Sequence, residues 1–141
     1  MHILVATDAD HVVNDVTSAL SAPDVSFTIC REGREVSRLV AERNPDVVVL
    51  DLQIGSKGGM AVAMDLRLDA TAGKPTDARI LMLLDRKADL HLARRSAADA
   101  WLVKPLDPLA IKRAVRDLMH PPAAVAAVVG EAAEEDVVAA G

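Results

Sequence analysis

Pro45-Asp46-Val47-Val48-Val49-Leu50-Asp51 is an apolar run of strand length, and the glycine-containing loop Leu52-Gln53-Ile54-Gly55-Ser56-Lys57-Gly58-Gly59 follows it directly. The uninterrupted residues 47–50 predict a strand that is covered on both faces. This strand carries the carboxylate of Asp51 to its carboxyl end, which is where ligands collect in α/β sheets. A carboxylate in that place can ligate a metal ion or act as a nucleophile toward phosphorus.

Apolar runs alternate with helical patterns along the rest of the chain. Besides residues 47–50, strands are predicted over residues 2–6, 25–30, 80–84 and 100–103, and helices over residues 10–21, 33–43, 59–69, 86–96 and from 107 to Pro121-Pro122. Residues 59–69 alternate in part like a strand, but their length and their Met, Leu and Ala content favour a helix. Residues 71–77 are expected to form a loop. Five alternating units predict a parallel α/β sheet with helices on both faces.

Two helix starts carry capping signals. Asp107-Pro108 places an N-cap residue before a proline in the first turn of the last helix. Asp10 stands at the start of the first helix, and we expect it to cap that helix.

Composition excludes several classes of protein. The 141 residues are 51% hydrophobic and 26% charged, which is typical of a globular domain. Phe27 and Trp101 are the only aromatic residues, whereas single-stranded nucleic acids are bound by aromatic stacking. The net charge is −5, and residues 121–141 hold −4 of it, which leaves −1 for residues 1–120. We therefore expect no nucleic-acid partner.

The ends of the chain suggest one domain with an appendage. Residues 1–120 are expected to form the domain, and residues 121–141, rich in Ala, Val and Glu, an acidic tail that stays disordered. We expect no separate output module, because this tail is too short to form one. The amino terminus lacks a basic signal-peptide region, no apolar run is long enough to span a membrane, and Cys30 has no intramolecular disulfide partner. These features favour a cytoplasmic protein that does not enter a membrane.

Residues that could bind a metal ion or take part in catalysis follow three of the predicted strands. The first strand ends in Thr7-Asp8-Ala9-Asp10, the third in Asp51 and the fifth in Lys104-Pro105. The carboxyl ends of parallel strands lie on one rim of the sheet, so we expect these groups to converge. Two carboxylates and a backbone carbonyl can hold Mg²⁺. A lysine that faces the same point can neutralise a transferred phosphoryl group.

At these residues the chain resembles the receiver domain of bacterial response regulators, over about residues 2–120. The segments that carry the resemblance are ILVATDAD, PDVVVLDLQIGSKGG and SAADAWLVKPLDP. The resemblance implies a flavodoxin-like α/β fold with five helices and the strand order 2-1-3-4-5.

The same resemblance implies a role for each matching residue. Asp51 would be the phospho-acceptor and Lys104 would contact the phosphoryl group. Asp8 and Asp51 would ligate Mg²⁺ together with the backbone carbonyl of Gln53. The Lys104-Pro105 peptide bond is a candidate for the cis form.

Three positions of the predicted site and switch depart from the family pattern, and in the loop after Asp51 the family often has Pro in place of Gly55 and Asp in place of Gly58. Thr7 stands where the acidic turn usually has its first acid, Leu84 where the fourth strand usually ends in Ser or Thr, and Trp101 where a Tyr or Phe is common. One carboxylate fewer predicts weak binding of Mg²⁺, although the nearby Asp10 could compensate in part. Leu84 cannot form a hydrogen bond with a phosphoryl oxygen, so we expect phosphorylation to be weakly coupled to shape.

Three functions follow, none of them enzymatic. In the first, a stand-alone receiver takes a phosphoryl group on Asp51 from a histidine kinase or other phosphodonor and signals by binding a downstream protein. The alternative, which Thr7 and Leu84 favour, is a pseudo-receiver that binds its partner without phosphorylation. A weaker alternative is a flavodoxin-like domain that binds a small anion or nucleotide. The resemblance suggests that the fourth helix, fifth strand and fifth helix form the surface that binds the partner. The sequence does not identify the partner, and it is compatible with a homodimer.

Individual residues also have simpler interpretations. Taken alone, Asp51 would fit a strand-end carboxylate that caps the next loop. Lys104 would fit a solvated surface lysine, and Trp101 a half-buried packing residue.

Overall fold

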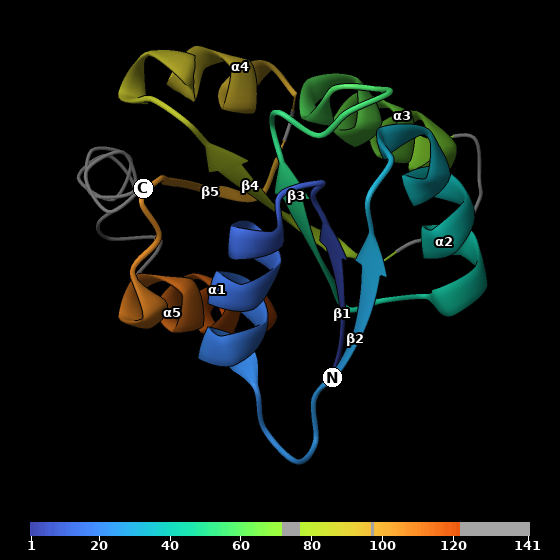
Figure 1. Cartoon of the computed structure of the whole chain (residues 1–141). Helices are drawn as coiled ribbons and strands as arrows, with labels where there is room; N and C mark the ends of the chain where they lie inside the picture. Colours follow the sequence, from blue (N-terminus) through green and yellow to red (C-terminus); the bar gives the residue numbers. More distant parts are fainter. Residues whose placement is uncertain (72–76, 97, 122–141) are drawn as a thin grey trace.

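The computed structural model describes residues 1–71, 77–96 and 98–121. These residues contain a five-stranded sheet in which all neighbouring strands are parallel, in the order β2-β1-β3-β4-β5. Helices α1 and α5 cover one face of the sheet, and α2, α3 and α4 cover the other (Figure 1). The predicted flavodoxin-like arrangement, with its strand order and five helices, is confirmed.

The strands and helices alternate along the whole described chain. The strands are β1 (His2–Ala6), β2 (Ser26–Cys30), β3 (Val47–Asp51), β4 (Arg79–Leu84) and β5 (Ala100–Val103). The helices are α1 (Asp10–Leu20), α2 (Val36–Arg43), α3 (Gly59–Thr71), α4 (Leu90–Arg95) and α5 (Pro108–Met119). Within the described residues, no helix combines the length and the apolar character that crossing a bilayer requires.

The predicted boundaries are confirmed for β1 and β5, and residues 59–69 are helical as predicted. Two helices begin differently: 3₁₀ turns over Gly33–Glu35 and Lys87–Asp89 precede α2 and α4, where a continuous α-helix was predicted. Such turns are frequent at helix amino termini, and hydrophobic periodicity does not distinguish them from an α-helical turn. Thr71 ends α3 and does not belong to the predicted loop. The rest of that loop, 72–76, and the tail from 122 onward lie outside the described residues.

The expectation that Asp10 caps α1 is wrong. The N-cap position is Ala9, and no side chain caps it. Asp10 is the first helical residue, and its carboxylate pairs with Arg31 at 2.7 Å. At the start of α5, Asp107 does occupy the N-cap position before Pro108, but its side chain makes no capping hydrogen bond.

Two apolar cores flank the sheet, because successive residues of each strand point to opposite faces. On β3, Val47 and Val49 pack with α1 and α5, while Val48 and Leu50 pack with α2, α3 and α4. All four side chains are fully buried, as predicted for a strand covered on both sides. Burying one such side chain contributes about 1.5–3 kcal/mol. The double cover holds β3, and with it Asp51, in a rigid position.

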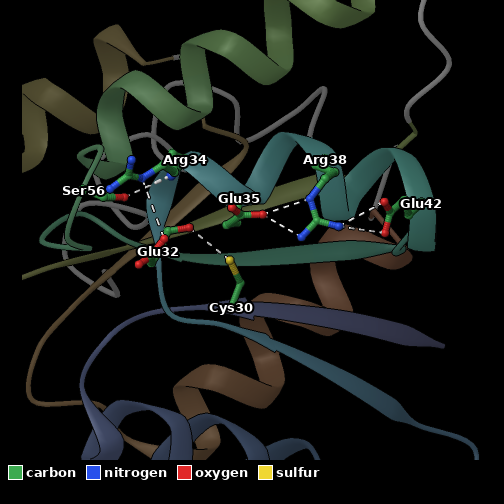
Figure 2. Close-up of polar contacts among 7 residues, drawn as sticks. All are labelled: Cys30, Glu32, Arg34, Glu35, Arg38, Glu42 and Ser56. Atoms are coloured by element: carbon green, nitrogen blue, oxygen red, sulfur yellow. Dashed lines mark hydrogen bonds and ion pairs between the residues drawn. The ribbon is translucent and has the colours of Figure 1, made fainter.

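Figure 2 shows the polar contacts made by α2, by the turn before it and by Cys30 at the end of β2. Arg38 pairs with Glu35 at 2.6 Å and with Glu42 at 3.0 Å along the exposed side of α2. Below the helix, the buried Cys30 thiol donates to the backbone oxygen of Glu32 at 3.1 Å. Burial is the main cause that raises the pKa of Cys30 above its ordinary value. We therefore assign Cys30 to packing.

Candidate functional site

The carboxyl ends of β1, β3 and β5 bring together Asp51, Lys104 and Thr7, the last of which was expected only as a departure from the family pattern. Asp51 ends β3 and is 1% exposed. Lys104 directly follows β5, and its Nζ lies 2.9 Å from Asp51 Oδ1. Thr7 directly follows β1, and its Oγ1 donates a hydrogen bond of 2.7 Å to Asp51 Oδ2. The predicted approach of Asp51 and Lys104 on one rim of the sheet is therefore present.

Both carboxylate oxygens of Asp51 accept hydrogen bonds. Oδ1 accepts from Lys104 Nζ and, at 3.1 Å, from the backbone N–H of Gln53, and Oδ2 accepts from Thr7. A buried carboxylate is tolerated only when it is paired in this way. The backbone turn after β3 supplies one of the donors, so the loop sequence directly contributes to holding the charge.

Thr7 lacks the acidic group that is usual at its position, but its hydroxyl makes hydrogen bonds of its own in the site. Its side chain is fully buried, and its hydroxyl also accepts a hydrogen bond of 3.2 Å from the backbone N–H of Ala9. Its own backbone N–H donates to the carbonyl of Cys30 at 2.9 Å, which fixes the residue at the end of β1. A second acid in this place would repel Asp51 in the absence of a cation, whereas the hydroxyl stabilises it.

Asp8 lies at the same rim but in a different role from Asp51. It is exposed, and its Oδ2 accepts a hydrogen bond of 3.0 Å from the backbone N–H of Gly55. The contact ties the loop after β1 to the loop after β3. The side chain of Gln53 is exposed as well. Among the described residues, no group of three or more His, Cys, Asp or Glu side chains is arranged to hold a metal ion.

Lys104 has a second acidic partner that the sequence interpretation missed. Its Nζ lies 3.1 Å from Asp85 Oδ1 as well as 2.9 Å from Asp51 Oδ1. Burial, the largest single effect, lowers the pKa of Lys104, but the hydrogen bonds and charges of both carboxylates together outweigh it and raise the pKa above its ordinary value. Lys104 is therefore a firmly charged ammonium shared by two carboxylates. Asp85 follows an apolar strand directly, which is the signal that identified Asp51.

The two remaining departures lie on the face covered by α4. Leu84 is fully buried in the core that includes Ala93 of α4, so it presents only apolar atoms. Trp101 is half-buried against the same core, and the guanidinium carbon of Arg94 lies 5.9 Å from its ring centroid. The buried indole Nε1 makes no hydrogen bond within the described chain. The peptide bond Lys104-Pro105 is cis, as the resemblance implied.

Comparison with known proteins identifies the family. The model of the response regulator receiver domain matches residues 3–116. The chain belongs to this family. A response regulatory protein of Mycobacterium tuberculosis, described as uncharacterized, is 32% identical to this receiver domain over 101 residues, or 72% of this chain and 73% of that protein. The aerobic respiration control protein ArcA of Escherichia coli is 26% identical over 84% of this chain, which spans only 48% of ArcA.

Solved structures agree with this assignment. The signal receiver domain of the response regulator NarL from Mycobacterium tuberculosis superposes with a TM-score of 0.70 at 25% identity, over 82% of this receiver domain and 93% of that chain. A response regulator from Chloroflexus aurantiacus superposes with a TM-score of 0.71 at 21% identity, over 83% and 95% of the two chains. The latter likeness shows the shared fold.

Proposed function

We propose that this receiver domain accepts a phosphoryl group on Asp51 and signals by binding another protein. The observation that carries the proposal is the contact of 2.9 Å between Asp51 Oδ1 and Lys104 Nζ at the carboxyl edge of the sheet. A nucleophilic carboxylate and a cation that can neutralise the incoming group are thus placed together. The family assignment supports the same chemistry.

The transfer is a displacement at phosphorus. A carboxylate oxygen of Asp51 bonds to the phosphorus of an acyl phosphate or a phosphohistidine. The bond between phosphorus and the leaving oxygen or nitrogen breaks, and the leaving group keeps its electron pair. The attacking oxygen must give up the hydrogen bond that it accepts from Thr7 or from Lys104. Lys104 then pairs with the negative charge of the phosphoryl oxygens.

The residues present fit a weak Mg²⁺ site. We propose that Asp8 and Asp51 supply carboxylates and Gln53 its backbone carbonyl. Within the described residues, the exposed carboxylate of Asp8 accepts one hydrogen bond, from the backbone N–H of Gly55, so it can turn toward a cation. Asp51 must exchange existing hydrogen bonds to do the same. Bound Mg²⁺ would neutralise charge on the transferred group. Because Thr7 stands where a further acid is usual, the affinity should be low.

Labelling with acetyl phosphate tests the proposal. We expect intact-mass spectrometry of the protein incubated with acetyl phosphate and Mg²⁺ to show the gain of one phosphoryl group. The Asp51→Asn variant should show none, because the amide is a poor nucleophile. Asp15→Asn, which removes an exposed acid on α1, is the matched control and should label like the wild type. Labelling that persists in Asp51→Asn would refute Asp51 as the acceptor.

The second candidate function is a pseudo-receiver that binds its partner without phosphorylation. The Thr7 hydroxyl, which satisfies Asp51 Oδ2, and the apolar Leu84 favour it. Under this alternative, the wild-type protein gains no mass, and Asp51→Asn leaves partner binding unchanged. Binding of a small anion or nucleotide at the same rim would instead be revealed by heat release on nucleotide titration.

Thr7→Asp is expected to raise the affinity for Mg²⁺ about tenfold, because an added carboxylate increases the negative charge around the cation. Without metal, the same variant should be less stable than the wild type, since it places a second negative charge beside Asp51. Titration calorimetry with MgCl₂ measures the affinity, and urea unfolding with and without Mg²⁺ measures the stability. Thr7→Val, which removes the hydroxyl without adding charge, should not gain affinity. Equal gains in both variants would contradict the charge argument.

The partners and boundaries remain part of the proposal. We propose a domain over residues 1–120, a histidine kinase or small phosphodonor upstream, and a protein partner that binds the surface formed by α4, β5 and α5. We also propose a cytoplasmic location. Receiver domains are generally signalling modules, so we assign no enzymatic activity of its own to this chain.

A further inference from the structure

We propose that Asp85 is a positioning residue that shares the ammonium of Lys104 with Asp51 and thereby connects the state of Asp51 to the segment leading into α4. The inference rests on the proposed phosphorylation of Asp51. Its basis is the pair of contacts that Lys104 Nζ makes, 2.9 Å to Asp51 Oδ1 and 3.1 Å to Asp85 Oδ1. One cation thus bridges the end of β3 and the residue that follows β4.

The segment after Asp85 is short and carries an ion pair within itself. Arg86 pairs with Asp89 at 3.0 Å, and Asp89 is 4% exposed. Arg86 precedes the 3₁₀ turn Lys87–Asp89, Asp89 ends it, and α4 begins at Leu90. Lys104 therefore holds Asp85, the residue directly before this segment, and the ion pair between Arg86 and Asp89 stabilises the turn that leads into α4. A change at Asp85 acts on a connection of four residues before α4 begins.

Leu84 cannot form a hydrogen bond with a phosphoryl group, so another residue must respond to phosphorylation. Its side chain is fully buried and has no donor or acceptor. Asp85 is the next residue, and its side chain is 37% exposed at the rim where Lys104 and Asp51 meet. Its contact with Lys104 is therefore a side-chain link from the Asp51 site to the start of the segment leading into α4, beside the backbone hydrogen bond of 2.8 Å that the Lys104 N–H donates to the Leu84 carbonyl.

Phosphorylation would change how Lys104 divides its contacts. The phosphoryl group places more negative charge and three acceptor oxygens on Asp51 in place of one carboxylate. The ammonium has three donors and moves toward the stronger charge. Asp85 then loses its partner, and the segment before α4 loses its side-chain contact with Lys104. A difference in contacts between the two states is what couples phosphorylation to shape.

In the unphosphorylated protein, two carboxylates compete for one ammonium, so Asp85 also adds negative charge that repels an anionic phosphodonor. Asp85→Asn is therefore expected to label with acetyl phosphate about 3- to 10-fold faster than the wild type. Asp117→Asn, at the far end of α5, removes an exposed acid and should label at the wild-type rate. Asp85→Glu, which keeps the charge, should restore the slow rate.

Nuclear magnetic resonance separates positioning from a structural role. In the unphosphorylated wild type, the side-chain NH₃⁺ signal of Lys104 should shift on Asp85→Asn substitution and not on Asp117→Asn. On labelling with acetyl phosphate, the carboxyl carbon of Asp85 and the backbone amide of Leu90 should shift in the wild type. In Asp85→Asn, labelling should leave the Leu90 amide in place.

The outcomes distinguish the inference from the proposed function. A wild-type protein that gains no phosphoryl group overturns the proposed function and the inference with it. A wild type that is labelled, with equal labelling rates in Asp85→Asn and equal shifts at Leu90, overturns the inference alone. Faster labelling of Asp85→Asn, together with loss of the Leu90 shift, supports both.

Discussion

Lys104→Met is expected to lower the free energy of unfolding by about 2 kcal/mol and to slow the labelling of Asp51 by about 10²-fold. Asp51 is 1% exposed, so removing Lys104 leaves a buried carboxylate with only neutral donors, Thr7 and the Gln53 backbone. The stability loss should be smaller than for a fully enclosed pair, because the Lys104 side chain is 18% exposed. Urea unfolding and mass-detected labelling measure the two effects.

A double-mutant cycle tests the cause of this loss. In the Lys104→Met background, Asp51→Asn removes the unpaired charge and should recover most of the lost stability. Recovery identifies the buried carboxylate as the origin of the cost. Strictly additive losses in the double variant would show instead that the Lys104 side chain acts through packing alone.

The pH dependence of the free energy of unfolding at alkaline pH provides a second test of the ion pair between Lys104 and Asp51. The pKa of Lys104 in the folded protein is raised above its ordinary value of 10.5. Its contribution is therefore fully present below about pH 10.5 and is lost as the pH rises through the raised value. The difference in unfolding free energy between the wild type and Lys104→Met should shrink over that range. A constant difference would contradict a charged pair.

Gly59→Ala is expected to cost about 2–3 kcal/mol of stability and to disturb Asp51. A Cβ at Gly59 would lie 2.7 Å from the backbone oxygen of Asp51 and 2.8 Å from the Cα of Leu52. Both neighbours are backbone atoms at the end of a fully buried strand, so neither can move without shifting the carboxylate. The labelling rate of Asp51 should therefore fall together with the midpoint of urea unfolding.

Gly58→Ala is the matched control for this prediction. A Cβ at Gly58 would meet the backbone oxygen of Leu52 at 3.9 Å, which is ordinary contact. Its effect on stability should stay within about 0.5 kcal/mol, and labelling should not change. If the two alanine variants behave alike, close approach at Gly59 does not determine the geometry of the loop.

Hydrophobic pattern was sufficient to predict most of the fold. The apolar run before Asp51 and four similar runs predicted five parallel strands, because covered strands require apolar residues on both faces. The pattern failed at the starts of α2 and α4, where 3₁₀ turns precede the helix. The capping preference of aspartate failed at Asp10, which pairs with Arg31 instead of capping α1. Such choices depend on neighbours distant in sequence.

The site was predictable only in part. The positions of Asp51 and Lys104 on one rim follow from the parallel topology. The hydrogen bond from Thr7 to Asp51 was missed because Thr7 was considered only as an absent acid. Asp85 was missed because the family pattern places its hydroxyl at Leu84, the last residue of the strand, whereas in this chain the next residue carries the charge. The contacts of a side chain with several strand ends require coordinates.

The placement of Trp101 gives the protein an intrinsic optical probe. The chain has one tryptophan and no tyrosine, so its ultraviolet fluorescence comes almost entirely from a single indole. That indole lies on β5, three residues before Lys104, with a buried ring nitrogen. Its emission wavelength depends on local polarity, so unlabelled protein reports events at this edge of the sheet in real time.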